Sequence, residues 1–294
     1  LFIENIDITR PFLFNVKNKT LNFISLKLYH KRYVSPERKA TGIDKANSSI
    51  ILPKKIKDEI GESTTDIVPH IVSMIYDNKL NYNPRPGIQT YANYDAYLDE
   101  IGYTKYTSQN KPEYIIYCAE NYNNYASIDN RYPFFDEPRT KIAMLENYTI
   151  IDSFENQLIL KSGNRNPLIY SNSRPLTYKL NTEFEIEKSK DLVLMKFDLS
   201  YSNLGKIIRF FYQPPSLKVR FTLDDGKQYT FKIIIGLLSE GVIVNKFLLT
   251  NKQVTQLYKK ELNTIPDIKK IEIIGNDWGF IKEIKSSSVI VKMK

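Results

Sequence analysis

Two stretches of the sequence bring arginine, carboxylate and tyrosine side chains together between prolines. The first runs from Tyr82 to Asp99 and the second from Ile128 to Pro138. The side chains in them that could contact a ligand are Arg85, Gln89, Tyr91, Tyr94, Asp129, Arg131, Asp136 and Glu137. An arginine fork binds phosphate or carboxylate through two hydrogen bonds, and two carboxylates about 5–10 Å apart can hydrolyse a glycosidic bond. The three acids of the second stretch therefore form a candidate set for a glycan-acting hydrolase, with the two arginines orienting the glycan.

The same side chains also have a structural interpretation. The prolines on either side of Arg85 restrict the backbone to an extended form, so we expect a stiff strut from which Arg85 points outward. Arg85 could form a bidentate ion pair with Asp136 or Glu137. Arg131 could do the same with Asp129. Both interpretations predict that the two stretches meet in space, and neither assigns a catalytic residue.

Residue types that nucleophilic or metal chemistry needs are sparse. The single cysteine, Cys118, ends the apolar run 114–118 and is expected to be a buried small hydrophobe. The two histidines are His30 and His70. Asp66, four residues before His70, is expected to be an incidental neighbour. The sequence has no cluster with zinc-ligand spacing and no glycine-rich phosphate loop, so we predict no metal and no cofactor.

The chain of 294 residues has a formal net charge of +9. Such a charge can attract a polyanion, or it can simply keep a lysine-rich surface soluble. Lysine outnumbers arginine and no run of four basic residues occurs, whereas nucleic-acid sites cluster their basic side chains. We therefore favour the solubility interpretation and expect no nucleic-acid partner.

Three segments are predicted. Residues 1–49 are expected to be a connector, and residues 50–162 a small α/β layer, because helices and strands alternate there. Helices are predicted at 53–60 (ending at Gly61), 69–78, 93–100 (capped by Asn93) and 137–147 (capped by Asp136). Strands are predicted at 64–68, 113–118, 148–151 and 157–161. A polar, turn-rich boundary follows at 162–167.

Beyond that boundary apolar and polar residues alternate with a period of two. Strands are predicted at 177–187, 192–199, 217–223, 229–235, 242–244, 268–274, 278–284 and 288–293. Asp224-Asp225-Gly226 predicts a hairpin turn, and residues 251–262 predict the one convincing helix of this half. Many short strands between turns indicate an antiparallel, jelly-roll-like β-sandwich over residues 163–294. The expected fold class is α+β overall.

Membrane-spanning segments are not expected within the sequence. No stretch approaches the roughly 20 apolar residues that a membrane helix needs, and no signal peptide is recognised. Because the chain begins at Leu1 rather than at methionine, we expect it to be a fragment or a processed form.

Several motifs are shared with one group of proteins. They are Asn-Pro-Arg-Pro at 83–86, Gln-Thr-Tyr at 89–91 with Tyr94, Ile-Asp-Asn-Arg-Tyr-Pro at 128–133, Asp-Glu-Pro at 136–138, Leu-Gly-Lys at 204–206 and Phe-Tyr-Gln-Pro-Pro at 211–215. With these motifs the sequence resembles the C-terminal extracytoplasmic region of large bacterial polytopic membrane proteins, some described as glycosyltransferase-like. The resemblance spans about residues 50–294. Gly87 and Thr90 stand where a larger apolar residue and a serine are expected.

The resemblance implies a location in the cell envelope, on the extracytoplasmic face of the cytoplasmic membrane. It also implies two partners: the membrane-embedded portion of the same parent chain, and a glycan or lipid-linked sugar. Our first hypothesis is a non-catalytic module that binds glycan or positions an acceptor, while the parent is a membrane glycosyltransferase with its catalytic residue elsewhere. The alternatives are the hydrolase described above and a structural domain that binds a protein through its tyrosine-rich face.

Overall fold

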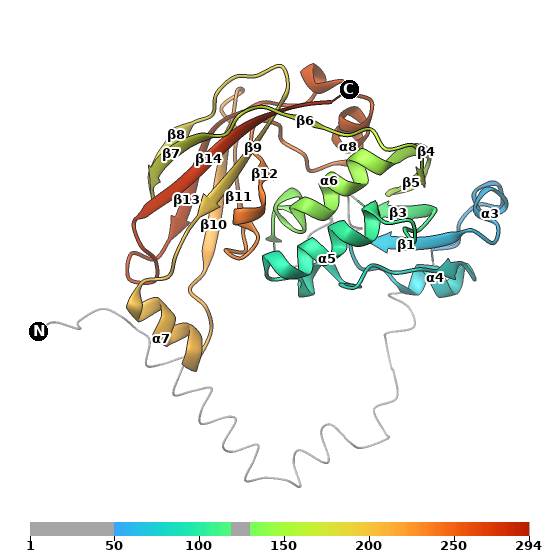
Figure 1. Ribbon diagram of the computed structural model, residues 1–294, viewed down its shortest axis with the longest axis horizontal. Helices are drawn as coiled ribbons and strands as arrows, with labels where there is room; N and C mark the ends of the chain where they lie inside the picture. Colours follow the sequence, from blue (N-terminus) through green and yellow to red (C-terminus); the bar gives the residue numbers. More distant parts are fainter. Residues whose placement is uncertain (1–49, 119–129, 294) are drawn as a thin grey trace, which may run out of the picture. The chain divides into compact units, whose positions relative to one another are not determined.

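The computed structural model describes residues 50–118 and 130–293, which belong to one compact unit (Figure 1). This described part contains three β-sheets and the helices α3 to α8. The fold is therefore mixed α+β, as the sequence predicted. Within the described residues, no helix is long and apolar enough to cross a bilayer.

The first sheet lies in the first half of the chain. Its strands, in spatial order, are β2 (Asn81–Tyr82), β1 (Thr64–Val68), β3 (Tyr114–Cys118), β5 (Gln157–Ser162) and β4 (Tyr148–Phe154). The β2, β1 and β3 strands are parallel, and β5 and β4 are added antiparallel. All five side chains of β3 are buried, as expected for a strand with both faces covered.

Helices cover both faces of this sheet. On one face α3 (Lys54–Ile60) and α4 (Ser73–Asp77) pack against Ile67, Ile116 and Ile159. On the other face α5 (Ala96–Thr107) and α6 (Pro138–Asn147) pack against alternate residues of the same strands, such as Ile115 and Leu160. Period-two alternation thus sends successive side chains into two different cores.

Two predicted helix caps are wrong. Helix α5 begins after Asp95, whose carboxylate accepts the Leu98 N–H at 2.9 Å, so Asn93 is not its cap. Helix α6 begins after Glu137 without a side-chain cap from its own chain neighbours. Instead Asp99 of α5 accepts the N–H groups of Arg139 and Thr140, each at 2.9 Å. A carboxylate at the positive, N-terminal end of a helix is stabilising. Asp99, which belongs to α5, therefore holds the N-terminus of α6 against α5.

The second half of the chain forms two antiparallel sheets. The second sheet consists of β11 (Gln228–Lys232), β10 (Leu217–Leu223), β13 (Ile268–Gly275) and β8 (Glu183–Glu185). The third consists of β12 (Val242–Ile243), β9 (Leu192–Asp198), β14 (Glu283–Lys292) and β6 (Ile169–Tyr170), with β7 (Arg174–Lys179) also paired to β14. Helix α8 (Asn251–Tyr258) starts at a capping box formed by Thr250 and Gln253.

The two halves share one hydrophobic core, which runs across the predicted boundary at 162–167. At its centre is Tyr132, which is fully buried among the rings of Phe135, Phe221, Phe231 and Phe247. The backbone N–H of Tyr132 donates to the Lys232 carbonyl at 3.2 Å. The segment at Arg131 and Tyr132 therefore lies along β11, the edge strand of the second sheet. The division into domains at residue 162 stays a prediction.

Further predictions differ from the structure. The predicted strand 177–187 is two strands, β7 and β8, which belong to different sheets; alternation alone does not reveal which neighbour a strand pairs with. A helix was also missed, α7 (Asn203–Phe211), which interrupts the strands of the second half. The turn at Asp224-Asp225-Gly226 is confirmed, with Gly226 at a φ of 81°.

Candidate functional site

The two motif stretches meet at the carboxyl end of the first sheet. There the chain leaves β1 toward β2 on one side of the sheet order, whereas after β3 it continues through α6 to β4 on the other side. Such a topological switch point is where open α/β sheets commonly bind ligands. In this protein that position is occupied by a group of buried polar side chains. We call it the Arg85 cluster, and its members are Arg85, Asp66, Thr90, Asn93, Tyr106 and Glu137.

Arg85 is at the centre of this cluster and is fully buried, so the prediction that it points outward is wrong. Its backbone N–H donates to the Asp66 carboxylate at 3.0 Å, which sets the direction of the side chain. The guanidinium donates to the carbonyls of Ile67 at 2.8 Å and Pro69 at 3.0 Å. It also donates to Thr90 Oγ1 at 2.9 Å and lies 3.5 Å from Asp66. With the bond to Glu137, all five N–H donors of the fork have acceptors.

Glu137 joins the second stretch to the first. Its carboxylate lies 3.2 Å from Arg85 Nε and also accepts hydrogen bonds from Thr90 and Asn93. The Glu137 backbone has a φ of 48°, an uncommon conformation for a residue with a side chain. Gly87 leaves room for this arrangement, because a Cβ there would come within 2.3 Å of the Asn93 amide. The predicted meeting of the two stretches is therefore confirmed.

Four members of the cluster were not predicted from the sequence: Asp66, Thr90, Asn93 and Tyr106. Asp66 makes contacts with two other members. It is fully buried in β1, and besides Arg85 it accepts the Tyr106 hydroxyl at 2.7 Å. Its neighbour His70 instead packs edge-on against Tyr91. A carboxylate in a buried strand seldom lacks a partner, so an aspartate in the predicted strand Thr-Thr-Asp-Ile-Val is a signal for a buried hydrogen-bond donor or cation.

Arg131 and Asp136 form a second pair, with 3.7 Å between Arg131 Nη1 and Asp136 Oδ1. Both side chains are buried. Arg131 also donates to the Tyr91 carbonyl at 3.3 Å, and its guanidinium lies over the Tyr94 ring at 4.8 Å. Asp136 thus pairs with Arg131 and does not cap α6. Asp129, the partner predicted for Arg131, lies outside the described residues.

The remaining predicted residues are closer to the surface. The Tyr91 hydroxyl donates to the Gln89 side chain at 2.6 Å, and Tyr94 is exposed. Gln89, Tyr91 and Tyr94 can therefore still reach a ligand, and that role stays a prediction. Every side-chain N–H of Arg85 has an acceptor, and Glu137 accepts three hydrogen bonds inside the cluster, so their geometry is that of a lock between two loops.

Ionisation of Asp136 should make the protein's stability depend on pH. Burial raises the pKa of Asp136 to about 6 from 3.8, although Lys141 and Arg131 oppose the shift. Because the folded pKa lies above the unfolded one, stability from this group is present below about pH 4 and is lost as pH rises through 6. The difference of just over two pKa units corresponds to about 3 kcal/mol. We expect Asp136→Asn to gain about that much stability relative to wild type between pH 4 and pH 7.

The measurement is urea unfolding of both proteins at pH 4, 5, 6 and 7. The exposed Asp77→Asn is the control, and its difference from wild type should stay constant. If the difference in unfolding free energy between Asp136→Asn and wild type does not change with pH, Asp136 is already ionised in the folded protein at pH 4.

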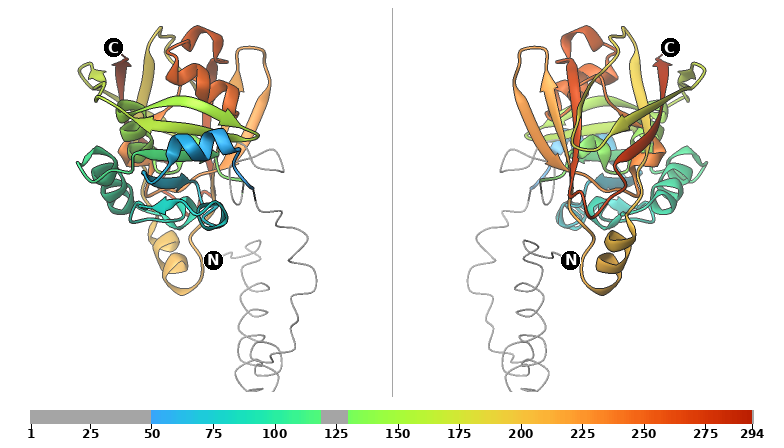
Figure 2. Two further views of the ribbon diagram at one scale, coloured as in Figure 1. Left: turned by 90° about the vertical axis from the view of Figure 1, so that its right-hand side faces the viewer. Right: turned by 90° about the vertical axis from the view of Figure 1, so that its left-hand side faces the viewer.

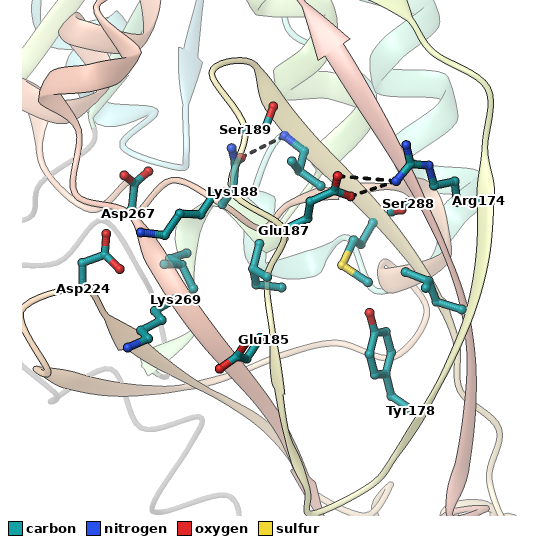
Figure 3. A pocket seen from close by; sticks show the side chains of 16 residues that line it. Arg174, Tyr178, Glu185, Glu187, Lys188, Ser189, Asp224, Asp267, Lys269 and Ser288 are labelled. Carbon is teal, nitrogen blue, oxygen red and sulfur yellow. Dashed lines mark hydrogen bonds and ion pairs between the residues drawn. The ribbon is translucent and has the colours of Figure 1, made fainter.

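A second candidate site is an open cleft of about 550 Å³ between the edge strands β7 and β8 (Figure 3). Its inner wall is apolar and includes Leu176, Ile186 and Met195. Its rim is charged. The Arg174–Glu187 ion pair (3.2 Å) lies on one side, and the side chains on the other are Lys188, Asp224, Asp267 and Lys269.

The cleft exists because the two edge strands diverge. Tyr178 of β7 and Phe184 of β8 stack with their ring centroids 3.8 Å apart and hold the strands together. Beyond that contact β7 follows β14 and β8 follows β13. An apolar wall with a few convergent polar groups is typical of small-molecule sites. The sequence does not reveal this cleft, because the alternation over residues 177–187 predicts a single strand where the structure has the two edge strands β7 and β8.

Cys118 is buried, as predicted, and burial raises the pKa of its thiol to about 12. The thiolate is the reactive form, so this residue is inert at neutral pH. Within the described residues no group of three or more His, Cys, Asp or Glu side chains is arranged to hold a metal ion.

Comparison with known proteins places no family name on this chain. No family model matches it, and no curated protein matches it. Among solved structures, one described as "Structural and functional characterization of Pseudomonas aeruginosa AlgX" is similar at 12% identity and a TM-score of 0.27. The match covers 79% of this chain and 50% of that one, so the chain spans about half the length of that protein. At this TM-score the likeness carries no argument about fold or function.

Proposed function

We propose that this chain is a non-catalytic extracytoplasmic module of a multi-spanning, glycosyltransferase-like membrane protein, and that it binds glycan. The two antiparallel sheets would form a jelly-roll-like β-sandwich, and the glycan would occupy the cleft between β7 and β8. The motifs at 83–94 and 128–138 support the proposed parent, on the extracytoplasmic face of the cytoplasmic membrane. The membrane-embedded portion of that parent would be the module's partner.

The observation that carries the non-catalytic role is the hydrogen bonding inside the Arg85 cluster. Glu137 accepts from Arg85, Thr90 and Asn93, and Asp136 faces Arg131. A hydrolase needs one carboxyl group to deliver a proton and a second to attack or to activate water. Glu137, which is held by three donors, is poorly suited to be the second of these groups, and this weighs against the hydrolase alternative.

The cleft supports glycan binding through its chemistry. A sugar presents hydroxyl groups around its edge and a more apolar face of C–H groups. The cleft offers charged rim groups such as Lys188 and Asp224 and an apolar wall that includes Ile186 and Met195. A volume of about 550 Å³ falls in the range of small-molecule pockets.

The test is a thermal-shift screen of the 294-residue chain with oligosaccharides of the bacterial envelope. A ligand present at 100 times its Kd stabilises by about 2.7 kcal/mol, which for a unit of this size raises the Tm by at least about 5 °C. We expect Ser288→Tyr, which fills the cleft from the central strand β14, to abolish that rise.

Ser287→Tyr is the matched control, since the next residue of a strand faces the opposite side of its sheet. It should keep the full ligand-induced rise in Tm. If no oligosaccharide changes the Tm of the wild-type chain, glycan binding is ruled out and a structural role in assembly is favoured. If Ser288→Tyr keeps the rise, the glycan binds elsewhere, and Gln89, Tyr91 and Tyr94 are the next surface to test.

A further inference from the structure

Helix α7 is amphipathic, and its apolar side faces solvent. It connects β9 to β10 and stands clear of the sheets in every view (Figures 1 and 2). Phe210 is 82% exposed and Phe211 73% exposed, and Leu204 and Ile207 are also exposed. Soluble proteins rarely leave neighbouring large apolar side chains on the surface without an interaction partner.

The base of α7 holds the helix in this orientation. Gly205 is its buried residue, and a Cβ there would lie 2.0 Å from the Gly279 carbonyl. Ser202 caps the helix by accepting the Gly205 N–H at 3.0 Å, and its own N–H donates to the Gly279 carbonyl at 3.1 Å. These contacts place one narrow side of α7 against the turn at residues 276–280, so the opposite side must face outward.

Basic side chains border the exposed apolar side. Lys206 and Arg209 lie on α7 and are exposed. No Asp or Glu occurs from residue 199 to residue 223. Arg209 also lies over the Tyr201 ring at 5.2 Å. Helices that lie in a membrane interface combine aromatic and aliphatic residues on one side with Lys and Arg beside them.

We infer that α7 docks onto an anionic lipid bilayer, with Phe210, Phe211 and Ile207 inserted among the acyl chains and Lys206 and Arg209 at the phosphate groups. The charge of the segment is complementary to such a surface. The size of the helix also favours a bilayer over a protein: nine residues span only about 14 Å, whereas stable protein interfaces bury about 800 Å² per partner. This inference does not depend on glycan binding.

The experiment measures co-sedimentation of the 294-residue chain with vesicles of phosphatidylcholine alone or with about 30% phosphatidylglycerol. We expect binding to the anionic vesicles that weakens with added salt. Phe210→Ser with Phe211→Ser should reduce the partition coefficient at least about tenfold, because it removes the two most exposed rings. Lys206→Glu with Arg209→Glu should give a similar loss on anionic vesicles.

Two matched controls separate α7 from the rest of a basic surface. Tyr97→Ser removes an exposed ring elsewhere and should not change binding. Lys252→Glu with Lys259→Glu makes the same change in net charge at α8, at the other end of the molecule, and should reduce binding less than threefold (Figure 1). All replaced side chains are exposed, so each variant is expected to fold.

Insertion can be seen directly by fluorescence. The sequence has a single tryptophan, Trp278, so Trp278→Phe with Phe210→Trp moves the only tryptophan to the tip of α7. Lipids brominated in their acyl chains should quench it. The inference is overturned if the paired serine variant binds vesicles as well as wild type. It is also overturned if wild type does not bind vesicles but forms a dimer that dissociates in the paired serine variant, since α7 would then be an interface between copies.

Discussion

Replacing Arg85 by alanine is expected to destabilise the protein by about 3–5 kcal/mol, the range for breaking a buried ion pair from one side. The substitution leaves Asp66 and Glu137 buried without their cation. It also removes donors from the Ile67 and Pro69 carbonyls and from Thr90. Because domains are stable by only about 5–15 kcal/mol, this single change removes a large part of the total. Urea unfolding at pH 7 measures it.

The control is the exposed pair of the same residue types, Arg174 and Glu187. Arg174→Ala should change stability by less than about 1 kcal/mol, as is usual for surface ion pairs. Arg85→Lys should recover only part of the loss, since an ammonium group cannot reproduce the planar fork. Equal effects of Arg85→Ala and Arg174→Ala would contradict the role given to the Arg85 cluster.

A double-mutant cycle isolates the Arg85–Glu137 interaction. Arg85→Met leaves two buried carboxylates without their cation, and adding Glu137→Gln removes the charge of one of them. We therefore expect the double variant to be less destabilised than the sum of the two single variants, by about 1–3 kcal/mol. An additive result would mean that the two side chains do not interact in solution, although they lie 3.2 Å apart here.

Tyr132→Ala is expected to have an effect of similar size, about 3–5 kcal/mol, because it opens a cavity at the junction of the two halves. The ring is fully buried, and its centroid lies 4.7 Å from that of Phe221 and 5.3 Å from that of Phe231. The hydroxyl has a separate role, since it accepts the Leu248 N–H at 2.8 Å. The loss of stability is measured by thermal and urea unfolding of the same variant.

Tyr132→Phe separates the two contributions. It keeps the ring and leaves the Leu248 N–H without its acceptor, for which we expect about 1–3 kcal/mol. Exposed Tyr97→Ala is the control and should stay within about 0.5 kcal/mol of wild type. A loss in Tyr132→Ala no greater than that in Tyr132→Phe would show that the packed rings add little at this junction.

Much of the candidate site could be predicted from local patterns. The prolines beside Arg85, the acids at 136–137 and the density of tyrosine marked both stretches, and the structure joins them through Glu137. The direction of the Arg85 side chain could not be predicted, because it depends on Asp66, 19 residues earlier, and on Glu137, 52 residues later. A buried cation is placed by its partners: the sequence offers Glu137 as one of two possible partners of Arg85, but it does not connect Asp66 with Arg85.

The sequence by itself determined where many elements begin and end. Helix α3 ends at Gly61, β1 and β3 lie where their apolar runs lie, and the Asp-Gly turn sits at 224–226. Each follows from backbone preferences and periodicity within a few residues of chain. Only the tertiary structure decided that Asp99 caps α6, that β7 and β8 part to form a cleft, and that α7 keeps its apolar side in solvent. These features depend on which distant surfaces pack together, and that is fixed by the burial of the whole chain rather than by any one segment of it.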